Sequence, residues 1–192
     1  MVQTDTRRGK LVVISAPSGA GKTSLAQAIL ARNPGMRFSV SATTRPMRSN
    51  EIDGTDYYFL TKEEFQHRVA AGEFAEWEEI YGDYYGTLRA EIDRALAAGQ
   101  HIIFDVDVKG GLSIKRLYPD ALLIFIRPPS AEVLYERLRS RHTENDAALA
   151  RRMERVPMEL ELGKQFDKQV TNDVLNQAIE EVQRLVQNYL KY

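Results

Sequence analysis

Residues 11–23 read Leu-Val-Val-Ile-Ser-Ala-Pro-Ser-Gly-Ala-Gly-Lys-Thr, and this stretch decides the fold. Its apolar start, Leu11–Ser15, predicts a buried strand, and residues 21–31 predict a helix. A strand that enters a glycine-containing loop, followed by Lys-Thr and a helix, is typical of a phosphate-binding loop. Ala16 stands where the strict pattern has its first glycine.

The residues Gly21, Lys22 and Thr23 each suit phosphate chemistry. Convergent backbone N–H groups bind phosphate oxygens, and a side chain at Gly21 would obstruct their approach. Lys22 supplies a positive charge to the β- and γ-phosphates, and Thr23 supplies a hydroxyl ligand for Mg²⁺. The alternative is a glycine-rich turn with a surface lysine, which the flanking strand and helix disfavour. The stretch therefore predicts a nucleotide phosphate site without fixing the reaction.

The composition of the 192-residue chain is that of an ordinary globular protein. The net charge of −1 disfavours a chain-wide cationic surface for nucleic acid, although it leaves a local basic patch open. The absence of cysteine excludes disulfides and thiolate sites and fits a reducing compartment. The longest apolar run, residues 121–126, is too short to span a membrane. We expect a cytoplasmic domain with no membrane or nucleic-acid partner.

Three short apolar runs predict the strands of a core: residues 11–15, 101–106 and 121–126. Helix-like stretches lie between them, including residues 88–98, and this alternation favours a parallel sheet covered by helices. A further strand is expected at 169–171, followed by an amphipathic C-terminal helix. The fold class is therefore α/β, a three-layer core built on the phosphate-binding loop.

Residues 41–94, here called the inserted module, differ from this core. The module has six basic and twelve acidic side chains and a cluster of tyrosines. Thr61 and Glu64 form a capping-box pattern that opens a short helix, which Gly72 ends. Residues 73–85 are more typical of a strand. We expect a small mixed α+β unit.

Residues 130–158, here called the lid segment, are rich in arginine. Six arginines and only three acidic residues lie between Arg137 and Arg155. Thr143 and Asp146 form a pattern that would cap a helix within the segment. Taken alone, such a helix is most simply a solvated surface.

Several motifs in order make the chain resemble guanylate kinase over almost its whole length. They are residues 38–48, Glu73-Phe-Ala-Glu-Trp77, residues 81–87, Ile102-Ile-Phe-Asp-Val-Asp107 with Gly110, and the stretch from Arg137 to Glu159. The resemblance implies a P-loop NTPase core over 8–40, 95–129 and 159–192, a GMP-binding module over 41–94 and a helical lid over 130–158.

The resemblance assigns the acceptor nucleotide to the inserted module. The residues expected at GMP are Ser41, Arg45, Arg48, Tyr57, Glu76, Tyr85, Thr87 and Asp107. Arginine offers planar donors to a phosphate. One carboxylate, that of Glu76, can accept both the N1–H and the N2–H₂ of guanine, a pair of donors that adenine lacks. Phe74 and Trp77 are expected in the core rather than stacked on a base.

The resemblance assigns ATP to the loop and the lid. The residues expected at ATP are Ala16, Pro17, Ser18, Gly19, Ala20, Gly21, Lys22, Thr23, Arg137 and Asn172. The catalytic residues expected are Lys22, Arg45, Arg141 and Arg152. Thr23, and Asp107 through a water, are the expected Mg²⁺ contacts. We rank Asp107 above Asp105 for direct nucleotide contact, and Asp105 could instead pair with an arginine.

The implied reaction is Mg·ATP plus GMP, with dGMP as a further acceptor, giving ADP and GDP. Lys109 and His142 depart from the family, which often has glutamine and glycine at these positions. Two alternatives stay open. A ribosyl bisphosphate phosphokinase should lack the residues expected at guanine, which are Ser41, Glu76 and Thr87. A guanylate-kinase-like protein-interaction module should have a degraded phosphate-binding loop. The sequence is compatible with a homo-oligomer but does not discriminate between assemblies.

Overall fold

The structure, a computed structural model, describes residues 8–80, 82–140 and 146–191. In chain order its elements are β1 (Leu11–Ser15), α1 (Lys22–Arg32), β2 (Met36–Phe38), β3 (Ser41–Thr43), β4 (Tyr57–Phe59), α2 (Lys62–Ala70), β5 (Phe74–Ile80), β6 (Asp83–Leu88), α3 (Arg89–Ala97), β7 (His101–Asp105), α4 (Val108–Leu117), β8 (Leu122–Arg127), α5 (Ala131–Arg139), α6 (Asp146–Gly163), β9 (Lys168–Thr171) and α7 (Leu175–Lys191). None of the helices in these ranges is long and apolar enough to cross a membrane.

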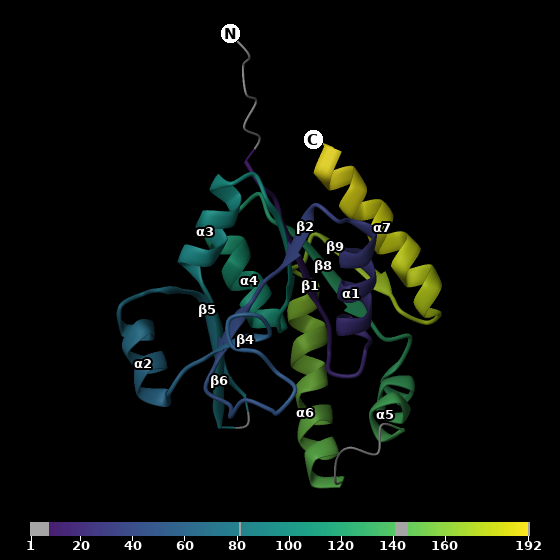
Figure 1. The fold of residues 1–192 in the computed structure, drawn as a ribbon. Helices are drawn as coiled ribbons and strands as arrows, with labels where there is room; N and C mark the ends of the chain where they lie inside the picture. Colours follow the sequence, from purple (N-terminus) through teal and green to yellow (C-terminus); the bar gives the residue numbers. More distant parts are fainter. Residues whose placement is uncertain (1–7, 81, 141–145, 192) are drawn as a thin grey trace.

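A parallel sheet with strand order β2-β7-β1-β8-β9 forms the centre of the molecule. Helices α1 and α7 pack on one face of this sheet, and α3 and α4 pack on the other, which gives three layers (Figure 1). The predicted α/β class and the predicted core strands are confirmed, and the short edge strand β2 was not predicted. Because β1 is the middle strand, the loop that follows it emerges at the centre of the sheet's carboxyl edge.

Side chains on both faces of the central sheet are buried, which explains the near-continuous apolar runs in the sequence. Val12 and Ile14 of β1 join the apolar cluster under α1 and α7, whereas Val13 joins the cluster under α3 and α4. Burial of each such side chain contributes about 1.5–3 kcal/mol. Packing from both sides therefore fixes β1 and the loop that it feeds.

A second sheet with strand order β4-β3-β6-β5 lies within the inserted module, at the lower left of Figure 1. Helix α2 packs on it through Phe65, whose ring stacks on Phe74 at a centroid distance of 4.3 Å. The Thr61 hydroxyl accepts the Glu64 backbone N–H, and the Glu64 carboxylate accepts the Thr61 N–H, so the predicted capping box is confirmed. The module thus has an apolar cluster of its own.

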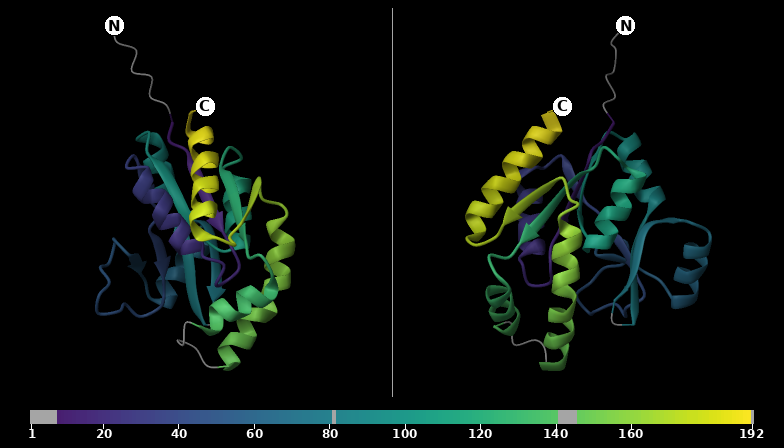
Figure 2. Two further views of the ribbon diagram at one scale, coloured as in Figure 1. Left: turned by 90° about the vertical axis from the view of Figure 1, so that its right-hand side faces the viewer. Right: turned by 180° about the vertical axis from the view of Figure 1, so that it is seen from behind.

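Helices α5 and α6 carry the arginine-rich lid segment and lie at the end of the molecule away from the C-terminus of α7 (Figure 2). Ser130 caps α5, because its hydroxyl accepts the Val133 N–H at 3.3 Å. Helix α6 runs on past the lid segment to Gly163, next to the Phe125 ring in the core. Thr143, the predicted cap, lies outside the described residues. One continuous helix therefore connects the lid segment to the core.

Candidate active site

The loop between β1 and α1 has the local geometry of a phosphate site. Gly21 caps α1 with φ at 92°, a left-handed conformation that favours glycine. A Cβ at Gly21 would also lie 2.4 Å from Nδ2 of Asn172, which donates to the Ala20 carbonyl at 2.8 Å. Local backbone and distant packing therefore both require glycine here. The N-terminus of α1 presents unpaired N–H groups and a positive dipole end to an anion.

Asp105 holds the two functional side chains of this loop. Lys22 Nζ lies 2.6 Å from Asp105 Oδ1, and Thr23 Oγ1 donates to Asp105 Oδ2 at 2.7 Å. The strand register explains the meeting, because Asp105 ends β7 directly beside Ile14 of β1. Within the described residues Asp105 thus pairs with a lysine, and the interpretation that it pairs with an arginine was wrong.

A cavity of about 530 Å³ lies over the loop, within the range that small-molecule sites occupy. Its lining comes from the loop, the inserted module, the core and the lid segment. These residues are Ala16, Pro17, Ser18, Gly19, Gly21, Lys22, Thr23, Ser24, Ile80, Asp107, Arg152, Arg155 and Glu159. The structure therefore gathers most of the predicted ATP residues with Asp107 and Arg152 around one volume.

Arg137 and Asn172 line a second cavity, of about 310 Å³, together with Gly19 and Gly21. Asn172 is buried, and its carbonyl accepts an N–H of Arg137 at 2.9 Å. Arg137 also donates to the Asp173 carbonyl at 3.1 Å. The two residues that the sequence placed at ATP thus meet beside the loop. Their assignment to the adenine side stays a prediction.

The second sheet brings the predicted acceptor residues to one face. Glu76 of β5 lies opposite Thr87 of β6, and the next pairs across the sheet place Ala42 opposite Gly86. Because side chains alternate along a strand, this register determines which residues share a face. The face toward helix α4 carries Ser41, Tyr57, Glu76, Tyr85 and Thr87.

Glu76 is buried against the start of α4. The Thr87 hydroxyl donates to Glu76 Oε1 at 2.6 Å, a cross-strand pair that follows from the register. A Cβ at position 110 would lie 2.8 Å from Glu76 Oε2, so a larger residue there would displace this carboxyl group. Burial raises the pKa of Glu76 to about 7, although the bond from Thr87 opposes the shift. An ionised carboxyl group only accepts hydrogen bonds, so this position suits a ligand that supplies donors.

Trp77 is the residue whose predicted burial is wrong. Phe74 is buried as expected, but Trp77 is 48% exposed. Trp77 follows Glu76 on β5 and therefore points to the opposite face, where its ring meets Phe65 and Tyr84 edge-on. The inward position of Glu76 thus sets the outward position of its aromatic neighbour.

Arg45 is held by a carboxylate within the module. Its two terminal nitrogens lie 2.9 and 2.7 Å from the two oxygens of Glu51, a bidentate pair. The guanidinium also lies over the Tyr57 ring, 5.2 Å from its centroid. Glu51 accepts the backbone N–H of Arg48 as well, and these two arginines lower the pKa of Glu51 to about 2. Arg45 and Tyr57 are therefore placed together, and Arg48 adjoins them through its backbone.

Asp107 caps helix α4, where the loop, the module and the lid segment meet. Its carboxylate accepts the N–H groups of Lys109 and Gly110 at 2.7 and 2.9 Å. Glu78 of β5 adjoins it, and burial together with Asp107 raises the pKa of Glu78 to about 7. Burial opposes ionisation of Asp107, but hydrogen bonds from Glu78 and from the helix N–H groups outweigh it and lower the pKa of Asp107. Asp107 is thus the more acidic member of the pair, whereas Glu78 ionises near pH 7.

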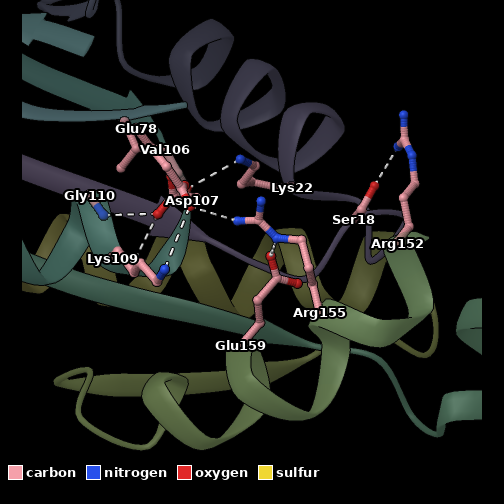
Figure 3. Close-up of polar contacts among 10 residues, drawn as sticks. All are labelled: Ser18, Lys22, Glu78, Val106, Asp107, Lys109, Gly110, Arg152, Arg155 and Glu159. Carbon is pink, nitrogen blue, oxygen red and sulfur yellow. Dashed lines mark hydrogen bonds and ion pairs between the residues drawn. The ribbon is translucent and has the colours of Figure 1, made fainter. Parts of the chain in front are cut away.

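The lid arginines reach the loop from α6 (Figure 3). Arg152 donates to the Ser18 hydroxyl at 2.6 Å. Arg155, one turn further on, donates to Glu78 Oε1 at 3.0 Å. Arg141, predicted to be catalytic, lies outside the described residues. Helix α6 therefore brings at least two arginines to the cavity over the phosphate-binding loop.

The comparisons with known proteins agree with this geometry. A family model described as "Guanylate kinase" matches residues 8–189. The chain belongs to the guanylate kinase family. A guanylate kinase of Chlorobium luteolum is 47% identical over 99% of this chain and 97% of its own length. One of Symbiobacterium thermophilum is 45% identical over 93% of this chain and 85% of its own.

A solved structure supports the same assignment. The crystal structure of guanylate kinase from Anaplasma phagocytophilum matches with a TM-score of 0.75 and 26% sequence identity, covering 95% of this chain and 86% of that chain. Membership in the guanylate kinase family confirms the predicted family, the predicted fold and the predicted class of enzyme, an ATP:GMP phosphotransferase. The intact Gly21-Lys22-Thr23 stretch disfavours a protein-interaction module. The presence of Ser41, Glu76 and Thr87 disfavours a ribosyl bisphosphate phosphokinase.

The loop of this guanylate kinase family member fits a magnesium ion. The Thr23 hydroxyl and the Asp105 carboxylate are adjacent oxygen donors of the type that Mg²⁺ prefers. The described residues contain no group of three or more acidic or histidine side chains that would hold a metal alone. Mg²⁺ typically takes one or two protein ligands together with substrate phosphates. The donor set is therefore that of an ion that binds with ATP.

Sequence reasoning missed several residues of the site. It did not identify Glu51 as the partner of Arg45, nor Glu78, Arg155 and Glu159 at the cavity. The sequence offered one signal for the contact of Asp105 with the loop. Asp105 lies at the end of a predicted strand, and the carboxyl ends of parallel strands meet at the same edge of a sheet. The other contacts join segments whose separation in sequence carries no pattern, such as Glu78 and Arg155.

Proposed function

We propose that this protein transfers the γ-phosphoryl group of ATP to GMP, giving ADP and GDP, and that dGMP is a second acceptor. The observation that carries the acceptor choice is the buried Glu76–Thr87 pair on the face of the second sheet that lies against α4. A carboxylate there can accept both donors on one edge of guanine. A site with buried polar groups of this kind rejects the wrong base by a factor of about 10⁴.

On the donor side, Lys22 and the N–H groups at the start of α1 neutralise charge on the β- and γ-phosphates. Asp105 positions both Lys22 and Thr23. Thr23 and Asp105 would hold Mg²⁺, with Asp107 contacting it through water, and the ion would offset the negative charge of the phosphates when ATP binds. We place the adenosine beside Asn172 and Arg137.

On the acceptor side, we assign the phosphate of GMP to Arg45, Arg48, Tyr57 and Tyr85. Glu51 fixes the plane of the Arg45 guanidinium before substrate arrives. We assign guanine to Glu76 and Thr87, with Ser41 on the same face and Asp107 at the adjoining helix cap. None of these contacts requires a ribose 2′-hydroxyl, which supports dGMP as an acceptor.

The chemical step needs no covalent enzyme intermediate. A phosphate oxygen of GMP attacks the γ-phosphorus in line, and ADP leaves with the bridging oxygen. Catalysis is positioning and electrostatic stabilisation by Lys22, Arg45, Arg141 and Arg152 rather than strong general base catalysis. Closure of the lid segment and the inserted module excludes water, which prevents hydrolysis of ATP. We also propose that the reaction takes place in the cytoplasm.

An acceptor panel tests the proposal. ADP release with Mg·ATP is measured for GMP, dGMP, AMP, CMP, UMP and a ribosyl bisphosphate. We expect turnover only with GMP and dGMP. Turnover with another acceptor would overturn the assignment of Glu76, and no turnover by a folded protein would favour a protein-interaction module.

A further inference from the structure

Four charged side chains from three elements meet at one edge of the cavity over the phosphate-binding loop (Figure 3). Arg155 of α6 donates to Glu78 of β5 at 3.0 Å, and its Nε lies 3.6 Å from Glu159, one turn along the same helix. Lys109 of α4 lies 3.8 Å from the same oxygen of Glu78. An acidic side chain of the inserted module is therefore held by cations from the lid helix and from the core.

The burial of this cluster makes its contacts stronger than those of surface ion pairs. The side chains of Arg155, Glu78 and Glu159 are 29%, 17% and 9% exposed. Charges that are partly withdrawn from water interact at a lower effective dielectric and are screened less by salt. Removal of one partner leaves the other partly buried with only its longer contact, Glu159 for Arg155 or Lys109 for Glu78. The pair can therefore bias the relative positions of the two elements.

The position of Arg155 relates the contact to the reaction. Arg155 lines the same cavity as Ser18 and Lys22 of the loop and as Arg152, which donates to Ser18. Glu78 lies two residues beyond Glu76 on β5, the strand that presents the guanine-facing carboxyl group. The contact thus joins the helix that reaches the donor phosphates to the strand that carries the acceptor site.

We propose that Arg155 and Glu78 form an electrostatic tie that couples the lid helix to the inserted module, so that binding of one nucleotide strengthens binding of the other. Arg155 is then a positioning residue that acts through Glu78. The inference rests on the proposed function, because its two ligands are the nucleotides of that reaction. A nucleotide that draws either element to the cavity draws the other with it, and the coupling is reciprocal.

The test measures this coupling directly. The Kd of GMP is measured by calorimetry with and without a saturating non-hydrolysable Mg·ATP analogue, and the ratio of the two values is the coupling factor. We expect Glu78→Ala and Arg155→Ala each to lower this factor about five-fold, the small end of usual couplings. The double variant should lose no more than either single one. The Kd of GMP without the analogue should change less than about two-fold, which is a small change in binding free energy.

Two further variants serve as controls. Glu78→Gln keeps a hydrogen-bond acceptor for Arg155 but removes the negative charge, so an electrostatic tie should lose most of its coupling in this variant. Arg151→Gln removes a charge from an exposed position of the same helix and should leave the factor unchanged. Thermal unfolding of every variant shows whether it is folded.

The outcomes separate this inference from the proposed function. A wild-type factor of one, an unchanged factor in Glu78→Ala or Arg155→Ala, or additive losses in the double variant would overturn the tie. Loss of ATP-analogue affinity in Arg155→Ala with an intact coupling factor would also overturn it, since Arg155 would then contact ATP directly. In each case the wild-type protein would still turn over GMP, whereas failure of the proposed function removes that turnover.

Discussion

The proposed donor site and the proposed acceptor site are held together in different ways. Lys22 and Thr23 are bound by Asp105, more than eighty residues away in sequence, across two strands of the central sheet. Arg45 is bound by Glu51 only six residues away, and Glu76 by Thr87 eleven residues away. The donor geometry therefore depends on the assembled core, whereas the acceptor geometry depends on one small sheet. A module with internal contacts of this kind can move as a unit without losing its binding groups.

The largest expected effect is on the donor side. Lys22→Ala should lower kcat about 10³-fold, because it removes a preorganised charge from the phosphates in the transition state. The measurement is ADP release with saturating GMP. GMP affinity, which depends on the module, should stay near the wild-type value.

Lys62→Ala, at the exposed start of α2, is the matched control and should be as active as the wild type. A loss of GMP affinity in Lys22→Ala as large as its loss of kcat would contradict the expectation that GMP affinity depends on the inserted module.

The next effect is on the acceptor side. Glu76→Gln should lower kcat/KM for GMP about 100-fold, because a charged acceptor for two guanine donors is replaced by a neutral one. The KM for ATP should be unaffected. Glu79→Gln, at an exposed position of the same strand, should retain full activity. A rise in the KM for ATP at saturating GMP in Glu76→Gln would contradict the assignment of Glu76 to the acceptor site.

The pH dependence of GMP binding follows from the raised pKa of Glu76, about 7. Only the ionised carboxyl accepts both guanine donors, so the KM for GMP should rise about ten-fold from pH 8 to pH 6. Lys22 favours the ionised form, whereas burial and the neighbouring Asp107 oppose it. Since the folded pKa lies above the unfolded value, ionisation of Glu76 destabilises the free protein as pH rises from about 4.3 toward 7.

Initial rates across this pH range test the expectation, with Glu76→Gln as the control for titration of the GMP phosphate itself. The same slope in both proteins would assign the effect to the substrate rather than to Glu76.

The smallest expected effect is on Glu51. Glu51→Gln should raise the KM for GMP about five-fold, because the ion pair that orients Arg45 becomes a neutral hydrogen bond. The pKa of Glu51 is lowered to about 2, so the pair persists at neutral pH and is lost only as pH falls through that value. Steady-state kinetics at varied GMP measure the change. An equal rise in the KM for ATP would contradict a contact that is internal to the module.

The sequence by itself determined the class of fold, and it predicted most of the residues that the structure gathers around the phosphate-binding loop. Apolar runs that alternate along the sequence with helix-like stretches predicted a buried parallel sheet. Strands that are buried on both faces do not show the alternation of polar and apolar residues seen in half-exposed strands. The residues from Gly21 to Thr23 predicted the phosphate site, because few residue types allow close phosphate approach. The capping box at Thr61 was also predictable from the sequence, since both of its hydrogen bonds join residues three positions apart.

The tertiary structure alone decided which side chains meet. The ranking of Asp107 above Asp105 could not include the contact of Asp105 with Lys22, because that contact depends on which strands are neighbours. Trp77 was misplaced because the face of an edge strand depends on its register and not on its composition. The tie between Glu78 and Arg155 joins a strand and a helix whose separation in sequence has no period. Short sequence patterns predict local structure and local chemistry, whereas contacts between distant segments follow only from the packing of the whole chain.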